Sequence, residues 1–269
     1  MARRRFYAPP ESVNGSLVVL SSHETHHLMN VLRMTPGDEA FVFDGNGNEY
    51  RCTFRRLEDN GAELEIVDSM SDIVESPLEL TLAQALAKGE KFDFIVQKAT
   101  ELGVNRIVPL VTRYADVRLD EGQRASRTER WRRISLESMK QCGRRKLVQI
   151  TEPLSIYQLM SALEHSGNTV TGAKPAHSLL LFSERGGIGV TEALGVNSKS
   201  RSVVALVGPE GGWSDDELET LSDYGCTPVT LGPRVIRTET AALVAITLIQ
   251  HTLGDLNPAN ERVLTNHNC

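Results

Sequence analysis

The sequence predicts an α/β protein in two parts, a small β-barrel or curled sheet over residues 1–73 and a helix-covered, mostly parallel sheet over residues 74–269. Three observations lead to this division. Short segments that alternate polar and apolar residues fill the first part, βα units repeat through the second, and the polar stretch 68–77 joins them. With 269 residues, 40% of them hydrophobic and 24% charged, the chain has the composition of a globular protein with a sizeable core.

The first part is expected to consist of short strands and turns. The turn sequence Asp44-Gly45-Asn46-Gly47 directly follows an apolar segment and predicts a hairpin there. A short helix is expected to follow the first of the strand-like segments. These segments are residues 18–20, 40–43, 50–54 and 62–67.

The second part alternates strands with helices. Gly103 is placed to end the first helix, which has apolar residues at helical spacing from Phe92 to Leu102. The last helix, residues 238–253, is apolar on nearly all sides, so it must be buried in the core or against a second subunit. Strands are expected at 78–83, 106–111, 147–150, 178–182, 202–207 and 227–231, and further helices at 127–142, 155–163 and 214–224.

Several features limit the class of protein. No apolar run approaches the roughly 20 residues of a membrane span, and Pro9-Pro10 stands where a signal peptide would need its apolar stretch. The four cysteines form no CxxC pair, which is typical of reduced thiols in a cytoplasmic protein. The segment from His23 to His27 matches the zinc-peptidase pattern HExxH, but Ser21 and Glu24 fit a helix-capping box. We interpret it as a helix start and expect no metal and no membrane.

The charge is unevenly distributed along the chain. The net charge is −6, yet residues 113–146 hold 11 basic against 5 acidic residues, 11 − 5 = +6. Such a segment in an acidic protein is either a binding face for a polyanion or a solvated helix face with salt bridges. Both interpretations stay open on the charge alone.

Two loops near the C-terminus are the candidate ligand site. Gly208-Pro209-Glu210-Gly211-Gly212 follows a buried strand, and the acidic helix start that follows, capped by Ser214, favours a neutral or cationic ligand over phosphate. In the second loop, Arg237 directly precedes the last helix and Thr238 is placed to cap it. The polar residues 237–240 are therefore either caps or ligand contacts.

These two loops carry a resemblance to a known family. Residues 206–214 (LVGPEGGWS) and 231–242 (LGPRVIRTETAA) resemble the RsmE family, the 16S ribosomal RNA (uracil-N3)-methyltransferases of the SPOUT superfamily. The segments 26–28 (HHL), 31–33 (VLR) and 43–45 (FDG) resemble the family's N-terminal PUA-like barrel. The middle segments 97–104 (QKATELGV) and 137–144 (ESMKQCGR) extend the resemblance over essentially the whole chain.

The resemblance implies an α/β methyltransferase domain with a C-terminal trefoil knot at 74–269, a PUA-like β-barrel that positions RNA at 1–73, and a homodimer. It also implies S-adenosylmethionine as cofactor and, as substrate, a uridine in the decoding region of 16S rRNA, within the small ribosomal subunit. The implied cofactor residues are Leu181, Gly208, Glu210, Gly211, Gly212, Leu231, Gly232, Ile236, Arg237 and Thr240.

Methylation of uridine N3 requires loss of its proton, hence a base or a cation that stabilises the uridinate oxygens. We expect Arg237 in the second role, with Glu210 or Glu239 as weaker candidates for the proton; alternatively Arg237 pairs only with Glu239 or across a dimer. The expected RNA contacts are Arg3, Arg4, Arg5, Arg33, Arg130, Arg133, Lys140 and Arg144. A related SPOUT enzyme with another target, a non-catalytic ribosome-binding factor and a zinc peptidase remain alternatives.

Overall fold

The computed structural model describes residues 3–70, 75–115, 117, 119–166, 177–195 and 201–257. The chain divides into two compact units, each described by itself. The first unit comprises Met1–Glu75 together with Leu136–Leu147, and the second comprises Ser76–Ser135 together with Val148–Cys269. The sequence did not indicate that residues 136–147 leave the second unit for the first.

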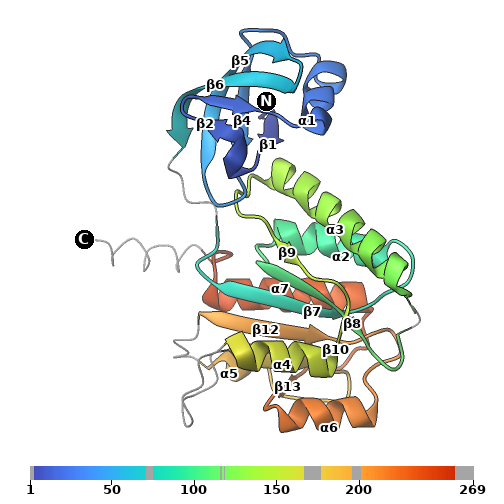
Figure 1. Ribbon diagram of the computed structural model, residues 1–269. Coiled ribbons are helices and arrows are strands. Elements are labelled where there is room, and N and C mark those ends of the chain that lie inside the picture. The colour runs from blue at the N-terminus through green and yellow to red at the C-terminus, as the bar shows by residue number, and fades with distance from the viewer. Residues whose placement is uncertain are drawn as a thin grey trace. The chain divides into compact units, whose positions relative to one another are not determined.

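The first unit is built on a six-stranded sheet in the order β1-β4-β5-β6-β3-β2 (Figure 1). Strand β1 runs parallel to β4, and the other pairs are antiparallel. The predicted hairpin is confirmed: it joins β4 to β5, and Asp44 Oδ1 accepts from the backbone N–H groups of Asn46 and Asn48 at 2.8 and 3.1 Å. The strands are β1 (Arg5–Tyr7), β2 (Val13–Asn14), β3 (Leu17–Val19), β4 (Glu39–Phe43), β5 (Glu49–Glu58) and β6 (Gly61–Met70).

The first unit also contains two short helical segments. One is a 3₁₀ turn (Pro10–Ser12), and the other is helix α1 (Ser22–His26), which continues as a π-helical turn (His27–Val31). Ser21 caps α1 as predicted, since its Oγ accepts from the backbone N–H of Glu24 at 3.3 Å. The carboxylate of Glu24 does not close a capping box, which corrects the expectation. It is buried and binds Lys140 Nζ at 2.5 Å instead, so the ion pair outcompetes the local turn.

The second unit contains a sheet in the order β10-β8-β7-β12-β11-β13, with β9 also paired to β8. All of these pairs are parallel, as the repeated βα pattern predicts. The strands are β7 (Glu79–Ala85), β8 (Arg106–Val111), β9 (Gln149–Ile150), β10 (Leu154–Ser155), β11 (Ser178–Phe182), β12 (Ser202–Val207) and β13 (Thr227–Val229).

Helices cover both faces of this sheet (Figure 1). On one face, α2, α5 and α7 share a core with Trp131 of α3, and on the other face α4 and α6 surround Leu206 and Trp213. The helices are α2 (Lys91–Glu101), α3 (Glu121–Cys142), α4 (Ile156–Ser166), α5 (Val190–Leu194), α6 (Asp215–Asp223) and α7 (Thr238–Leu253).

The last helix and the basic helix depart from the expectations in informative ways. Helix α7 has the predicted bounds and buries Ala242, Ile246 and Ile249, but Leu248 on its other face is 39% exposed. Helix α3 begins six residues before the predicted position 127 and passes from the second unit into the first between Ser135 and Leu136. Gly103 follows α2 with a φ of +84°, as the predicted helix end requires.

Candidate active site

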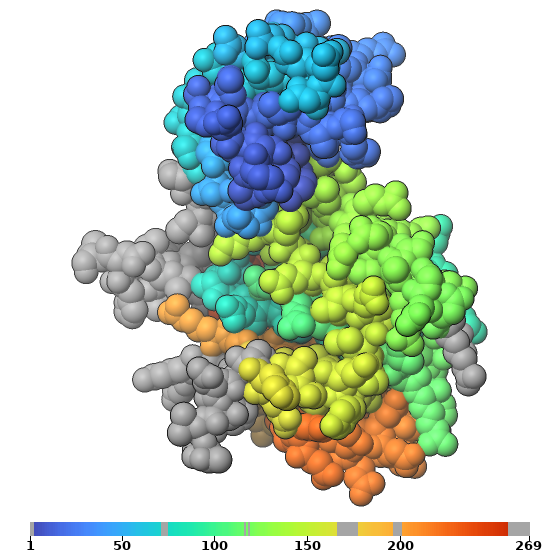
Figure 2. Space-filling view, in the orientation of Figure 1, coloured from blue at the N-terminus to red at the C-terminus, as the bar shows by residue number. Residues whose placement is uncertain are grey.

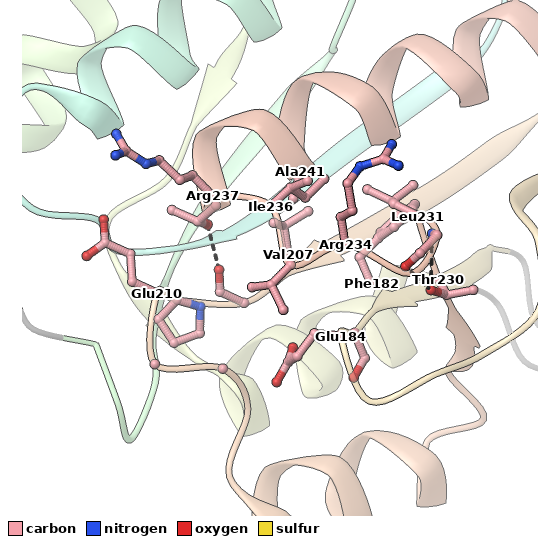
Figure 3. Close-up of a pocket in the computed structure, with 18 of the residues that line it drawn as sticks. Phe182, Glu184, Val207, Glu210, Thr230, Leu231, Arg234, Ile236, Arg237 and Ala241 are labelled. Atoms are coloured by element: carbon pink, nitrogen blue, oxygen red, sulfur yellow. Dashed lines mark hydrogen bonds between the residues drawn. The ribbon is translucent and has the colours of Figure 1, made fainter.

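Two loops meet at the carboxyl ends of the parallel strands in the second unit. The glycine loop, residues 208–213, leaves β12, and the arginine loop, residues 230–237, connects β13 to α7. Together with the end of β11 they enclose a cavity of about 550 Å³ (Figure 3). Ligands of open parallel sheets bind at this edge, and the volume suits a small-molecule ligand.

Most of the predicted cofactor residues line this cavity. They are Gly208, Glu210, Gly211, Gly212, Leu231, Gly232, Ile236 and Arg237. Two predicted residues do not line it. The resemblance implied the backbone near Leu181 as one side of the site: Leu181 itself is buried in the core, while the adjacent Phe182 and Ser183 line the cavity, and Thr240 is exposed on α7.

The glycine loop is packed too closely for side chains. A Cβ on Gly208 would lie 2.9 Å from Trp213 Nε1, and one on Gly212, whose φ is +72°, would lie 2.5 Å from a carboxylate oxygen of Glu184. The indole of Trp213 is held in place because its N–H donates to the carbonyl of Phe182 at 3.0 Å. Glycine is therefore required at these positions for the loop to pack against Trp213 and Glu184.

The first residue of α7 corrects a prediction. Thr238 does not cap the helix: Arg237 occupies the cap position, and no side chain bonds there. The Thr238 hydroxyl instead donates to the carbonyl of Gly208 at 2.6 Å and accepts from Gln84 Nε2 at 2.9 Å. This hydroxyl joins the glycine loop to the arginine loop.

The charged groups of the cavity are arranged differently from the acidic rim that the sequence suggested. Of Glu210 and the three acidic residues that begin α6, only Glu210 lines the cavity, and it forms an ion pair with Lys91. Asp215 and Asp216 pair with arginines, and Glu217 completes the predicted capping box with Ser214. The other charged lining residues are Glu184, Arg234 and Arg237.

Figure 3 shows Arg237 and Glu210 at one end of the cavity and Arg234 at the other. Arg237 is exposed and has no ion-pair partner among the side chains that the structure describes. The alternative, an ion pair between Arg237 and Glu239 of the same chain, is not present among the described residues. One carboxylate oxygen of Glu239 is shielded from solvent without a hydrogen-bond partner in the described part of the chain, and Glu239 does not line the cavity.

Sequence reasoning missed several lining residues. Lys91, Phe182, Glu184 and Arg234 carry side chains with obvious binding chemistry. Phe182 could have been found from the sequence, because it is the last residue of a predicted strand that ends at the ligand edge. Lys91 gave no such signal, since its partner Glu210 is 119 residues away.

The predicted RNA-binding residues fall into two groups. Arg130 and Arg133 are exposed on the second-unit part of α3, which lies on the surface (Figure 2), and Arg130 contacts Asp93 at 2.5 Å. In the first unit, Arg3, Arg4 and Arg33 are exposed. Arg118 of the basic tract lies outside the described residues.

The second group is buried within the first unit, which corrects the expectation of an exposed basic face. The Arg5 guanidinium binds Glu49 at 2.6 Å and donates to carbonyls at the C-terminus of α3, including that of Met139 at 2.5 Å. Lys140 binds Glu24, and Arg144 binds a carboxylate of Glu75 at 2.9 Å. Arg144 also lies beyond the end of α3. These three side chains stabilise the first unit and are not available to a polyanion.

The histidine motif has the expected helix-start geometry. His23 is exposed and stands 3.6 Å from the Glu24 carboxylate, which is already bound to Lys140. Within the described ranges, no three histidine, cysteine, aspartate or glutamate side chains are grouped as metal ligands would be. In the same ranges, no helix combines the length and the apolarity needed to cross a membrane.

The chain is similar to known proteins over most of its length. Residues 74–250 match a family described as RNA methyltransferase domain, and residues 20–67 match RNA methyltransferase PUA domain. Ribosomal RNA small subunit methyltransferase E of Bacillus subtilis is 30% identical over 86% of this chain and 89% of its own. The same enzyme of Buchnera aphidicola (subsp. Schizaphis graminum) is 33% identical over 90% of this chain and 93% of its own.

Solved structures give the same result. Ribosomal RNA small subunit methyltransferase E of Neisseria gonorrhoeae, bound to S-adenosylmethionine, is 32% identical with a TM-score of 0.81, and the match covers 95% of this chain and all of the other. A Legionella pneumophila protein in complex with the same cofactor is 32% identical, with a TM-score of 0.82 and the same coverage.

Proposed function

Since this chain belongs to the RNA methyltransferase family that includes the ribosomal RNA small subunit methyltransferases E, we propose that it methylates 16S rRNA with S-adenosylmethionine. The acceptor is N3 of a uridine in the decoding region of the small ribosomal subunit. The observation that carries the proposal is the cavity, because the two loops that resemble the family's motifs enclose it together.

The cavity residues fit this cofactor. S-adenosylmethionine carries a sulfonium and an ammonium group but no phosphate, and the carboxylate of Glu184 offers a counter-charge, whereas that of Glu210 is already paired with Lys91. Phe182, Leu231 and Ile236 provide an apolar surface for an adenine ring. Gly208, Gly211 and Gly212 line the cavity without side chains of their own, so the cofactor can approach their backbone closely.

When bound, S-adenosylmethionine supplies an electrophilic methyl group. The residues of the chain must then hold the uracil in line and stabilise the anion left when N3 loses its proton. Arg237 is a candidate for the second task, because this residue lines the cavity and has no ion-pair partner in the described part of the chain. It would donate hydrogen bonds to the uridinate oxygens.

Glu210 is the proposed proton acceptor, with one condition. Its carboxylate is paired with Lys91, so that pair has to open or rearrange before the carboxylate can reach N3. Glu239 is a weaker candidate because it does not line the cavity. The structure thus favours Arg237 over either carboxylate as the first residue to test.

The proposal assigns RNA contacts to the exposed arginines only. Arg130 and Arg133 on α3 would bind phosphates of the substrate, with Arg3, Arg4 and Arg33 of the PUA-like unit as positioning contacts. Charge reversal of Arg130 and Arg133 together should weaken binding to 16S rRNA and leave S-adenosylmethionine affinity unchanged. Loss of both affinities would indicate misfolding instead.

We further propose a homodimer in which the outer face of α7, with the exposed Leu248, packs against its copy. The trefoil knot formed by the two loops, as SPOUT enzymes have, belongs to the same proposal. A ribosomal substrate also favours a cytoplasmic location.

The test is transfer of labelled methyl groups from S-adenosylmethionine to small ribosomal subunits that lack the modification, with naked 16S rRNA in parallel. Label in RNA supports the enzyme and shows which of the two substrates it prefers. RNA binding without any transfer, by protein that binds the cofactor, would favour a non-catalytic ribosome-binding factor.

A further inference from the structure

Gln84 is a fully buried amide next to the cofactor cavity that does not line it. It lies near the end of β7, where it pairs with Val207 of β12 on one side and Pro109 of β8 on the other. A polar side chain in such a position lowers stability unless its hydrogen bonds are made. The hydrogen bonds of Gln84 therefore indicate its role.

Only half of this amide is satisfied within the described residues. Nε2 donates to the carbonyl of Ala85 at 3.0 Å and to Thr238 Oγ1 at 2.9 Å, whereas Oε1 has no partner. The carbonyl of Ala85 can only accept, so the NH₂ group must face it and the amide cannot be flipped. A methionine of similar shape would avoid the unsatisfied oxygen, so this position is not optimised for stability alone.

The orientation of Gln84 also determines the direction of the next hydrogen bond. A threonine hydroxyl has one proton, and Thr238 Oγ1 already accepts from Gln84. Its proton is therefore directed at the carbonyl of Gly208, which lies 2.6 Å away and 30 residues earlier in the chain. Thr238 and Gly208 both line the cavity, one at the start of α7 and one in the glycine loop.

We propose that Gln84 is a positioning residue for S-adenosylmethionine, which fixes the distance between the two cavity walls through Thr238. The inference rests on the proposed function, because it takes the cavity to be the cofactor site. Gln84 itself touches no ligand. It keeps the Thr238 hydroxyl directed at Gly208, so that the glycine loop is already in its binding position before the cofactor enters.

The test compares stability with cofactor affinity in the full chain. Gln84→Met removes the donor and the unsatisfied oxygen together, so we expect unchanged or higher resistance to urea. Affinity for S-adenosylmethionine by titration calorimetry should nevertheless fall about fivefold, which is the usual effect of one lost neutral hydrogen bond. If Gln84 only stabilised the fold, the stability and the cofactor affinity of Gln84→Met would change in the same direction.

Variants of Thr238 and a second buried glutamine complete the experiment. Thr238→Val should lose about as much affinity as Gln84→Met, Thr238→Ser should keep the wild-type affinity, and the Gln84→Met/Thr238→Val double variant should be no weaker than Thr238→Val alone. Gln250→Met is the matched control: this amide is equally buried but binds Ser76 and Gly103, away from the cavity, so only stability should fall.

The outcomes separate the two proposals. Wild-type protein that binds no S-adenosylmethionine would overturn the proposed function and this inference with it. Wild-type binding with unchanged affinity in Gln84→Met and Thr238→Val would overturn the positioning role alone. If Gln84→Met does not fold, the difference between Thr238→Val and Thr238→Ser decides whether the hydroxyl positions the loop.

Discussion

Replacing Gly208 by alanine tests the close packing on which the cavity wall depends. The new Cβ would lie 2.9 Å from Nε1 and 3.0 Å from Cε2 of Trp213. The indole cannot easily move aside, because it is 1% exposed and its N–H is bonded to the carbonyl of Phe182. Overpacking of this kind in a well-packed interior costs about 1–3 kcal/mol.

We therefore expect the free energy of unfolding of Gly208→Ala, from urea denaturation, to fall by about 1–3 kcal/mol. If the glycine loop moves to relieve this overpacking, stability will fall less. S-adenosylmethionine binding, measured by titration calorimetry, should then weaken by about tenfold for each 1.4 kcal/mol relieved. Gly122→Ala, in the exposed first turn of α3, is the control and should lose neither stability nor affinity. Wild-type stability together with wild-type affinity in Gly208→Ala would refute the close packing.

Three other variants or labels test separate parts of the account. Arg237→Ala should lower kcat about 10²- to 10³-fold at saturating cofactor and RNA, and normal turnover would exclude its role with the uridinate. Glu49→Gln leaves the buried Arg5 and Arg145 without their counter-charge and should lower the free energy of unfolding by about 3–5 kcal/mol. The control Glu39→Gln, at an exposed ion pair, should change it by less than about 1 kcal/mol, and equal effects would contradict the burial of the Glu49 ion pairs. Burial raises the pKa of Cys226 to about 12, so at pH 8 iodoacetamide should label the exposed Cys142 much faster, as peptide mass mapping would show; equal labelling rates would contradict the burial of Cys226.

Local signals in the sequence predicted most of the second unit. Strand β12, helix α7 and the Ser214 capping box follow from apolar periodicity and cap residues, which act within a few positions along the chain. The position of the cavity follows as well, because the carboxyl ends of parallel strands meet at one edge. These predictions needed no knowledge of distant contacts.

Two of the failures involve partners that are distant in sequence. Lys140 has the spacing of an exposed helix residue, yet it pairs with Glu24, 116 positions away, in the first unit. Periodicity gives the face on which a residue lies but not which unit packs on that face. Thr238 matched a local cap, but a carbonyl 30 residues away binds its hydroxyl instead.

The identity of the methylated nucleoside tests the central claim most directly. Small ribosomal subunits that lack the modification would be treated with the wild-type chain and S-adenosylmethionine, and the digested 16S rRNA would be analysed by chromatography and mass spectrometry. We expect 3-methyluridine as the single new nucleoside, and its loss with Arg237→Ala. A methyl group on the ribose 2′-oxygen or on another base would contradict the proposed acceptor while leaving the fold and the cofactor site intact.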